Sequence, residues 1–285
     1  MDESNNKSRS KRDIAKLITQ IENGAELTPP HSEATVVGVT GAPGSGKSTL
    51  ISAMARALID RGKKIGVIAV DPSSPISGGA VLGDRIRLNF THENLFFRSI
   101  ATRGMRSVSK SAYTIAKVLG AGGYDMIIIE TVGGGQEDYE ICAISDLSLL
   151  VLCPESGDSI QMLKSGIIEL ADAIVLNKSD MEGSEIFYTM LKNSFPEKHI
   201  FRTVALYSRG VEDLTSFMLS WKSVEDHRKE AAIRSFLAMM LKEELFSRFL
   251  KENRDVFEEN VRAVAKREKE IYEAIEDLMK GKDKL

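Results

Sequence analysis

The sequence predicts an α/β fold with a mostly parallel sheet and helical extensions at both ends of the chain. Between residues 34 and 221, short apolar runs alternate with stretches of helical composition. Continuous apolar runs are typical of parallel strands that helices cover on both faces. Segments with helical periodicity flank this region. We therefore expect an N-terminal helical extension at 1–33, an α/β domain at 34–221 and a C-terminal helical arm at 222–285.

The N-terminal extension is predicted to contain one amphipathic helix. Four apolar residues recur at helical spacing, namely Ile14, Leu17, Ile18 and Ile21. Pro29 and Pro30 end this segment before the first strand, because a proline cannot continue a helix. Acidic residues interrupt the basic ones near the start, and no apolar signal-peptide core follows. We therefore expect a solvated terminus.

Seven apolar runs are predicted as the strands of the sheet. They are residues 35–40, 64–70, 95–99, 126–130, 147–152, 173–177 and 200–204. The C-terminal arm then shows two apolar stripes at helical spacing. Their members are Phe236, Met240, Leu245 and Phe249, followed by Val261, Val264, Ile271, Ile275 and Leu278. Two interpretations of the arm remain open: it contacts a second subunit, or it packs back on its own domain.

Composition narrows the class of protein. The formal net charge of −3 and the pI of about 5.9 provide no basic field for nucleic acid. No apolar run approaches the ~18 residues of a membrane span. Cys142 and Cys153 do not form a C-x-x-C pair, so neither a disulfide framework nor a zinc site is indicated. We expect no nucleic-acid or membrane partner, and a reducing, cytoplasmic location.

The most informative motif is a phosphate loop. Residues 41–48 read G-A-P-G-S-G-K-S, a full match to G-x-x-x-x-G-K-[S/T], between the strand 35–40 and a helical run at 47–58. Backbone N–H groups of such a loop point into one concavity, where the next helix adds the positive end of its dipole. The alternative is a chance glycine-rich turn. The candidate nucleotide-binding residues are Gly41, Gly44, Ser45, Gly46, Lys47, Ser48 and Thr49.

Three residues at the end of this loop have predicted roles. Lys47 would reach the β- and γ-phosphates and take part in catalysis, and Ser48 would place its hydroxyl on Mg²⁺. Thr49 would neighbour the α-phosphate. We therefore expect this chain to bind a nucleoside polyphosphate with Mg²⁺.

A second motif, N-K-S-D at residues 177–180, predicts which base is bound. It follows the apolar run that begins at residue 173. An aspartate at this point accepts hydrogen bonds from both N1–H and the exocyclic amine of guanine, a pair that adenine does not offer. Asn177, Lys178 and Asp180 are thus candidates for recognising guanine. The alternative is a solvated helix start that Asp180 caps.

Acidic residues at strand ends are candidates for the metal and for hydrolysis. Glu130 ends the strand 126–130 and would hold Mg²⁺ through water, while Gly133 would let a backbone N–H approach the γ-phosphate. Asp71 follows another strand and Asp84 lies in a glycine-rich loop, so both are placed to contact the metal or order the attacking water. Gln136 is a further candidate for orienting that water. The alternative is that these acids are ordinary loop carboxylates.

Together these residues resemble the MeaB/ArgK-type GTPases, the family that includes the methylmalonic aciduria type A protein. The likeness spans residues 35–180. It is carried by D-P-S-S-P at 71–75, G-G-A-V-L-G-D-R at 78–85, R-S-I-A-T-R-G at 98–104, E-T-V-G-G-G-Q-E-D at 130–138, and N-K-S-D.

The resemblance implies a P-loop GTPase that cycles between GTP and GDP and serves an adenosylcobalamin-dependent acyl-CoA mutase. In such a role it gates cofactor loading and protects the mutase. The resemblance also implies a homodimer built partly by C-terminal helices. By position, Asp71, Asp84 and Glu130 match the family's magnesium and hydrolysis acids.

Three alternatives remain open. One is a metallochaperone-type GTPase, although the histidines are scattered. Another is a scaffold GTPase with another client. The third is a transport-linked ATPase or kinase, which the N-K-S-D motif disfavours.

Overall fold

The structure is a computed structural model that describes residues 10–25, 27–71, 90–101, 108–131, 136–154, 166–222 and 227–280. Its contacts divide the chain into two compact units, Met1–Phe236 and Leu237–Leu285. The larger unit contains the whole sheet.

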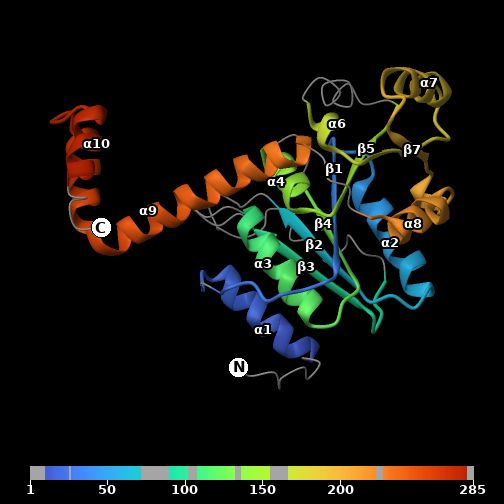
Figure 1. Cartoon of the computed structure of the whole chain (residues 1–285), viewed down its shortest axis with the longest axis horizontal. Helices are drawn as coiled ribbons and strands as arrows, with labels where there is room; N and C mark the ends of the chain where they lie inside the picture. The colour runs from blue at the N-terminus through green and yellow to red at the C-terminus, as the bar shows by residue number, and fades with distance from the viewer. Residues whose placement is uncertain are drawn as a thin grey trace. The chain divides into compact units, whose positions relative to one another are not determined.

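The sheet has seven strands, and every pairing between them is parallel (Figure 1). The strand order is β3-β2-β4-β1-β5-β6-β7. The strands are β1 (Thr35–Gly41), β2 (Ile65–Asp71), β3 (Leu95–Ala101), β4 (Met126–Glu130), β5 (Leu147–Leu152), β6 (Ala173–Leu176) and β7 (His199–Arg202). The predicted α/β class with a mostly parallel sheet is confirmed. The largest differences at a strand end are two residues: β7 ends two residues before the predicted limit of 204, and β3 ends two residues after the predicted limit of 99.

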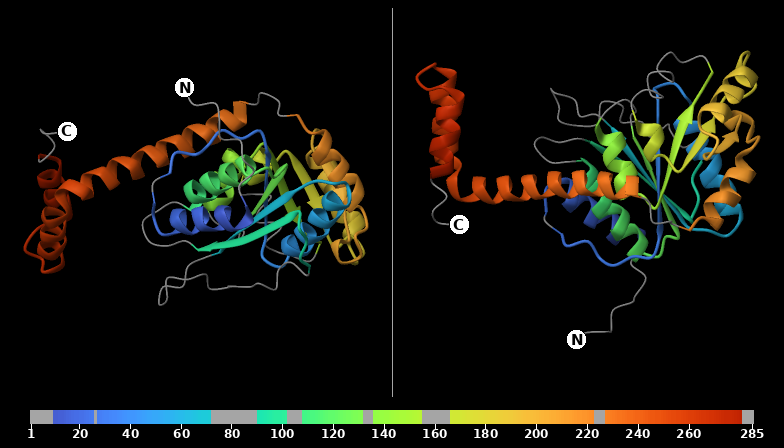
Figure 2. Two further views of the ribbon diagram at one scale, coloured as in Figure 1. Left: turned by 90° about the horizontal axis from the view of Figure 1, so that it is seen from below. Right: turned by 45° about the horizontal axis from the view of Figure 1, so that its top comes forward.

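Helices cover both faces of the sheet (Figures 1 and 2). Side chains that alternate along β5 separate the faces, because Leu149 and Val151 pack in one cluster while Leu150 and Leu152 pack in another. The first face carries α2 (Lys47–Asp60) and α8 (Val211–Ser220). The second carries α1 (Lys11–Glu22), α3 (Val108–Ala121), α4 (Gln136–Ile144), α6 (Ile167–Leu170) and α7 (Ser184–Ser194).

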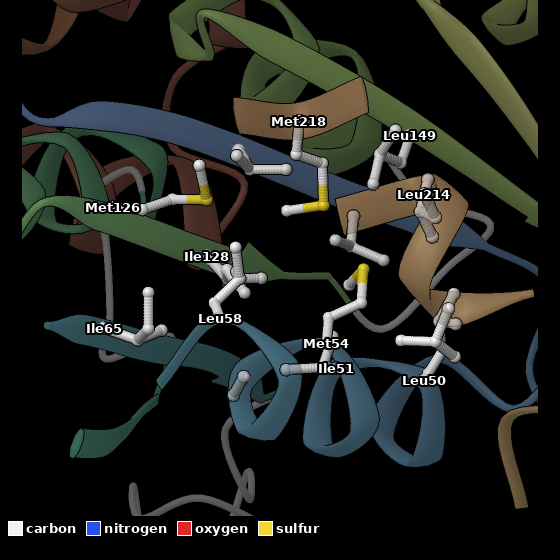
Figure 3. Packing of buried hydrophobic residues seen from close by; sticks show 14 of the residues in the cluster. Leu50, Ile51, Met54, Leu58, Ile65, Met126, Ile128, Leu149, Leu214 and Met218 are labelled. Atoms are coloured by element: carbon white, nitrogen blue, oxygen red, sulfur yellow. The ribbon is translucent and has the colours of Figure 1, made fainter. Parts of the chain in front are cut away.

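The packing of α2 fixes the helix that follows the phosphate loop. Its residues Leu50, Met54 and Leu58 are fully buried and point toward the sheet and α8, as Figure 3 shows. Leu214 and Met218 of α8 meet them in the same cluster. Burying a side chain of this size contributes about 1.5–3 kcal/mol. The start of α2 is therefore held firmly at the end of β1.

The amino-terminal edge of the sheet is held by aspartate carboxylates. Each of three aspartates stands one residue before a strand and accepts the backbone N–H of a residue at the start of the neighbouring strand or next to it. The pairs, each with an N–O distance of 2.7 Å, are Asp125 with Lys64, Asp146 with Val36, and Asp172 with Ser148. These bonds link three pairs of neighbouring strands at this edge.

Helix α1 is attached to the edge strand β3 by polar contacts at both of its ends. Lys11 Nζ donates to the carbonyl oxygen of Leu95 at 2.9 Å. Near the other end, the Arg98 guanidinium pairs with the Glu22 carboxylate and donates to Thr19 Oγ1 at 3.3 Å. The hydrogen bond to Glu22 raises the pKa of Arg98. The helix thus covers part of the sheet that would otherwise be exposed.

The second unit, Leu237–Leu285, holds most of α9 (His227–Ala265) and all of α10 (Ile271–Lys280). Backbone angles at Asn253 are not helical, so α9 is interrupted there. Lys269 Nζ donates to Asn260 Oδ1 at 2.9 Å and to Asp277 Oδ2 at 2.8 Å, which ties α9 to α10. None of the helices that the structure describes has the length and apolar character that crossing a membrane requires.

Candidate nucleotide-binding site

The candidate site lies at the carboxyl edge of the sheet. Strand β1 lies between β4 and β5, so the strand order reverses there. The helix after β1 covers one face of the sheet, and the helix after β4 covers the other. In open parallel sheets, ligands bind in the crevice that such a reversal leaves.

The phosphate loop follows β1 and depends on glycine. Gly41, Gly44 and Gly46 have φ values of 145°, 77° and 89°, a region that residues with side chains rarely adopt. A Cβ at Gly41 would lie 2.1 Å from the Val151 carbonyl oxygen, and one at Gly46 would lie 2.4 Å from Asn177 Nδ2. Only glycine therefore fits the first and last of these positions.

Lys47 begins α2, and its ammonium folds back over the loop. Nζ donates to the carbonyl oxygens of Gly41 at 2.7 Å and Ala42 at 3.0 Å, and the residue is only 6 % exposed. A cation buried this far requires such acceptors, because desolvation of an unpaired charge is costly. The ammonium is thus held beside the backbone that would surround a phosphate.

Ser48 and Glu130 bring two oxygen ligands together beside the loop. Ser48 Oγ donates to Glu130 Oε1 at 2.6 Å, and Glu130 is 3 % exposed. Glu130 ends β4 and lies in register with Val39 of β1 and Ala69 of β2. Hydroxyl and carboxylate oxygens are ligands that Mg²⁺ accepts. Thr49, the next residue of α2, is exposed.

The N-K-S-D segment is joined to the phosphate loop by Asn177. Its Nδ2 donates to the carbonyl oxygen of Ser45 at 2.9 Å. Its Oδ1 accepts from Thr203 Oγ1 and from the Ala205 backbone N–H, both at 3.1 Å. Asn177 is 2 % exposed, so all of these groups meet away from water. Lys178 has a φ of 56°.

Asp180 is exposed at the start of the turn that leads to α7. Its carboxylate is therefore accessible to a ligand, in contrast to the buried Asn177.

Sequence reasoning missed Thr203 and Ala205. Both follow β7 and hold the Asn177 side chain from the side opposite the phosphate loop. The prediction placed Thr203 inside a strand at 200–204, where it was one more β-branched residue. The signal that could have identified Thr203 is its position: it is a polar residue near the end of an apolar run, at the carboxyl edge of the sheet.

Two buried hydroxyls at the loop stand out. Thr40 Oγ1 and Ser45 Oγ find no hydrogen-bond partner among the residues that the structure describes. Buried hydroxyls are generally paired, so each of these costs stability in this arrangement.

Several predicted residues fall outside the description. The backbone of Asp71 ends β2, and Gln136 begins α4, but nothing is described of either side chain. Asp84 and Gly133 lie wholly outside the described residues. The structure therefore brings together the phosphate loop, Glu130 and the 177–180 segment.

The sheet, the glycine loop and the converging oxygens define a P-loop nucleotide-binding protein. The chain belongs to the family described as "Methylmalonyl Co-A mutase-associated GTPase MeaB", whose model matches residues 5–255. It is therefore a P-loop GTPase, and the family assignment made from the motifs is confirmed.

Two relatives of known name are similar to this chain, the first of them named a "putative GTPase". One from Pyrococcus horikoshii is 39 % identical over 245 residues, which is 78 % of this chain and 75 % of that one. The fused isobutyryl-CoA mutase of Cupriavidus metallidurans is 39 % identical over 189 residues, which is 61 % of this chain and 17 % of that protein.

A solved structure titled as a LAO/AO transport system kinase has a similar fold. Its TM-score is 0.56 at 21 % identity, and the match covers 95 % of this chain and 98 % of that one. Identity this low establishes the fold alone.

Proposed function

We propose that this chain is a Mg²⁺-dependent GTPase that acts in the cytoplasm as a chaperone for an adenosylcobalamin-dependent acyl-CoA mutase, assisting cofactor loading and protection. The family description links its members to methylmalonyl-CoA mutase. A relative that contains a similar segment is named as a fused isobutyryl-CoA mutase. Both names support a client of this chemical class.

The pairing of Ser48 with Glu130 is the observation that carries the metal part of the proposal. Their oxygens are 2.6 Å apart beside Lys47, so a small hard cation and its bound water would find two oxygen partners at the place where phosphates are expected. Bound Mg²⁺ would neutralise charge on the β- and γ-phosphate oxygens. Ser48 would then act as a direct ligand and Glu130 as an acceptor for metal-bound water.

The phosphate and base sites would act through separate residues. Lys47 would exchange its two carbonyl acceptors for phosphate oxygens, which are stronger partners for an ammonium. Asp180 would accept from guanine, while Asn177 would keep the base-binding segment attached to the phosphate loop. GTP would thus be preferred to ATP, because adenine would leave the Asp180 carboxylate without its donors.

The remaining candidate residues would complete the metal site and the hydrolytic machinery. Asp71 and Asp84 would share the metal or order the attacking water. Gly133 would offer its N–H to the γ-phosphate, and Gln136 would orient the water.

A homodimer is also part of the proposal. Within the second unit, large apolar side chains are exposed on α9 and α10, and they would need a partner surface. They are Leu237, Leu241, Leu245, Phe246, Val256, Val261, Ile271, Tyr272, Ile275 and Met279.

The central experiment measures binding to the adenosylcobalamin-dependent mutase encoded in the same genome. Binding is compared with GDP and with a non-hydrolysable GTP analogue, while GTP turnover is followed in parallel. Affinity that depends on the nucleotide, together with faster turnover, would support the chaperone function. Equal, negligible binding in both states would contradict it.

Lys47→Ala tests the nucleotide site independently of the client. We expect this variant to lose GTP binding, because the only change is removal of a buried ammonium beside the loop. Lys192→Ala, at an exposed position on α7, is the matched control and should bind GTP normally. Normal GTP affinity in Lys47→Ala would refute the assignment of the phosphate loop.

A further inference from the structure

A buried hydroxyl–carboxylate pair begins at the residue next to Glu130, the proposed acceptor for metal-bound water. Thr131, the next residue, is 1 % exposed, and its Oγ1 donates to Asp138 Oδ1. Asp138 lies in the first turn of α4 and is 2 % exposed. The pair therefore joins the end of β4 to the start of α4.

The pair is well placed to be strong. A carboxylate taken out of water is costly unless it is hydrogen-bonded, and an O–H donor to a carboxylate forms one of the shorter and stronger hydrogen bonds. A position in the first turn of a helix adds the favourable end of the helix dipole. The hydrogen bond from Thr131 and the position at the start of α4 thus explain how Asp138 can be buried.

Thr131 is also held through its backbone. Its N–H donates to the carbonyl oxygen of Val39 in β1 at 3.1 Å. The backbone of Thr131 is thus attached to β1, and its side chain is attached to α4. These two attachments fix the backbone from which the Glu130 side chain extends, and Ser48 Oγ holds the carboxylate at its other end.

We propose that Thr131 and Asp138 are positioning residues that hold Glu130 in the orientation needed to accept a hydrogen bond from Mg²⁺-bound water. This inference rests on the proposed metal role of Glu130. It adds a pair of residues that lie outside the phosphate loop and the base-binding segment and act only through Glu130.

The test compares Thr131→Val with Thr131→Ser. Valine keeps the β-branched shape but has no hydroxyl, whereas serine keeps the donor. Mg²⁺ affinity of the GDP-bound protein is measured by titration calorimetry, and the Mg²⁺ concentration for half-maximal GTP turnover is measured separately. GDP affinity without Mg²⁺ and thermal unfolding report on the rest of the molecule.

We expect Thr131→Val to weaken Mg²⁺ binding by about 10–100-fold, the usual effect of losing an outer hydrogen-bond partner of a metal site. GDP affinity without Mg²⁺ should stay unchanged, and Thr131→Ser should resemble the wild type. Equal Mg²⁺ affinity in Thr131→Val and Thr131→Ser would overturn the inference.

A second variant covers the case in which Thr131→Val does not fold. Asp138→Asn keeps an acceptor oxygen for Thr131 but removes the charge, and it should weaken Mg²⁺ binding less than 10-fold while exceeding the effect of Thr131→Ser. An Asp138→Asn protein with wild-type Mg²⁺ affinity would also overturn the inference. If the wild-type protein itself needs no Mg²⁺, the proposed function fails instead, and the two failures are thereby distinguished.

Discussion

Replacing Asn177 by alanine should destabilise the protein even when no nucleotide is present. The side chain makes hydrogen bonds to three buried groups, which are the Ser45 carbonyl, the Thr203 hydroxyl and the Ala205 N–H. Alanine would leave each of them without this partner. Asp180, three residues further on, is exposed and offers a contrast within the same motif.

The expected loss can be worked out from these bonds. A hydrogen bond of this kind contributes about 1–1.5 kcal/mol, so losing all three should lower the free energy of unfolding by about 3–5 kcal/mol. Thr203→Val removes one of the three hydrogen bonds, so it should lower the free energy of unfolding by about 1 kcal/mol. The free energy of unfolding of Asp180→Ala should stay within about 0.5 kcal/mol of the wild-type value, because the substitution alters only an exposed side chain.

The assay is urea denaturation of nucleotide-free protein, followed by circular dichroism, with GTP affinity measured separately. Asp180→Ala should lose GTP affinity while keeping its stability, and Asn177→Ala should lose both. If Asn177→Ala and Asp180→Ala unfold at the same urea concentration, Asn177 does not join the two loops in the way described. A cost below about 1 kcal/mol for Asn177→Ala would refute the reasoning equally.

Three further predictions concern the loop and the sheet. Gly46→Ala should weaken GTP binding and lower the free energy of unfolding by about 1–3 kcal/mol. The reason is that the new Cβ would lie 2.4 Å from Asn177 Nδ2, at a residue whose φ is 89°. Nucleotide titration measures the first effect and urea denaturation the second. Thr40→Val should raise the free energy of unfolding by about 1 kcal/mol, since it removes a buried hydroxyl with no described partner, and a decrease would mean that the hydroxyl is paired. Asp146→Ala should lower the free energy of unfolding by about 1–3 kcal/mol and speed hydrogen exchange at the Val36 amide. Asp146→Asn keeps an acceptor oxygen, so the Val36 amide should exchange more slowly in this variant than in Asp146→Ala.

Local patterns predicted much of the fold. The seven strands lie where the apolar runs indicated, because a strand buried on both faces leaves an unmistakable run of apolar residues. The phosphate loop was equally clear, since its eight-residue pattern is local and places glycine at the positive φ angles of Gly41 and Gly46. Such features depend on neighbours in the sequence.

The features that were not predicted depend on distant residues. Asn177 was predicted to recognise guanine, but its hydrogen bonds to Ser45, 132 residues earlier, and to Thr203, 26 residues later, were not predicted. Thr203 itself looked like part of a strand. Likewise, nothing local to Asp146 indicates that it meets the Val36 amide. Contacts of this kind follow from the strand order, which a one-dimensional pattern does not contain.

The position of β1 has a consequence for synthesis. This strand is the first to leave the ribosome, but its two neighbours in the sheet, β4 and β5, end only at residues 130 and 152. At about 5–20 residues per second, the delay between Val36 and its acceptor Asp146, 110 residues later, is on the order of ten seconds. Until β4 has been made, the apolar strand β1 lacks both neighbours, and until β5 follows, the growing chain has no complete site for a nucleotide. The ability to bind GTP is therefore acquired late, although the glycines that define it are made before six of the seven strands.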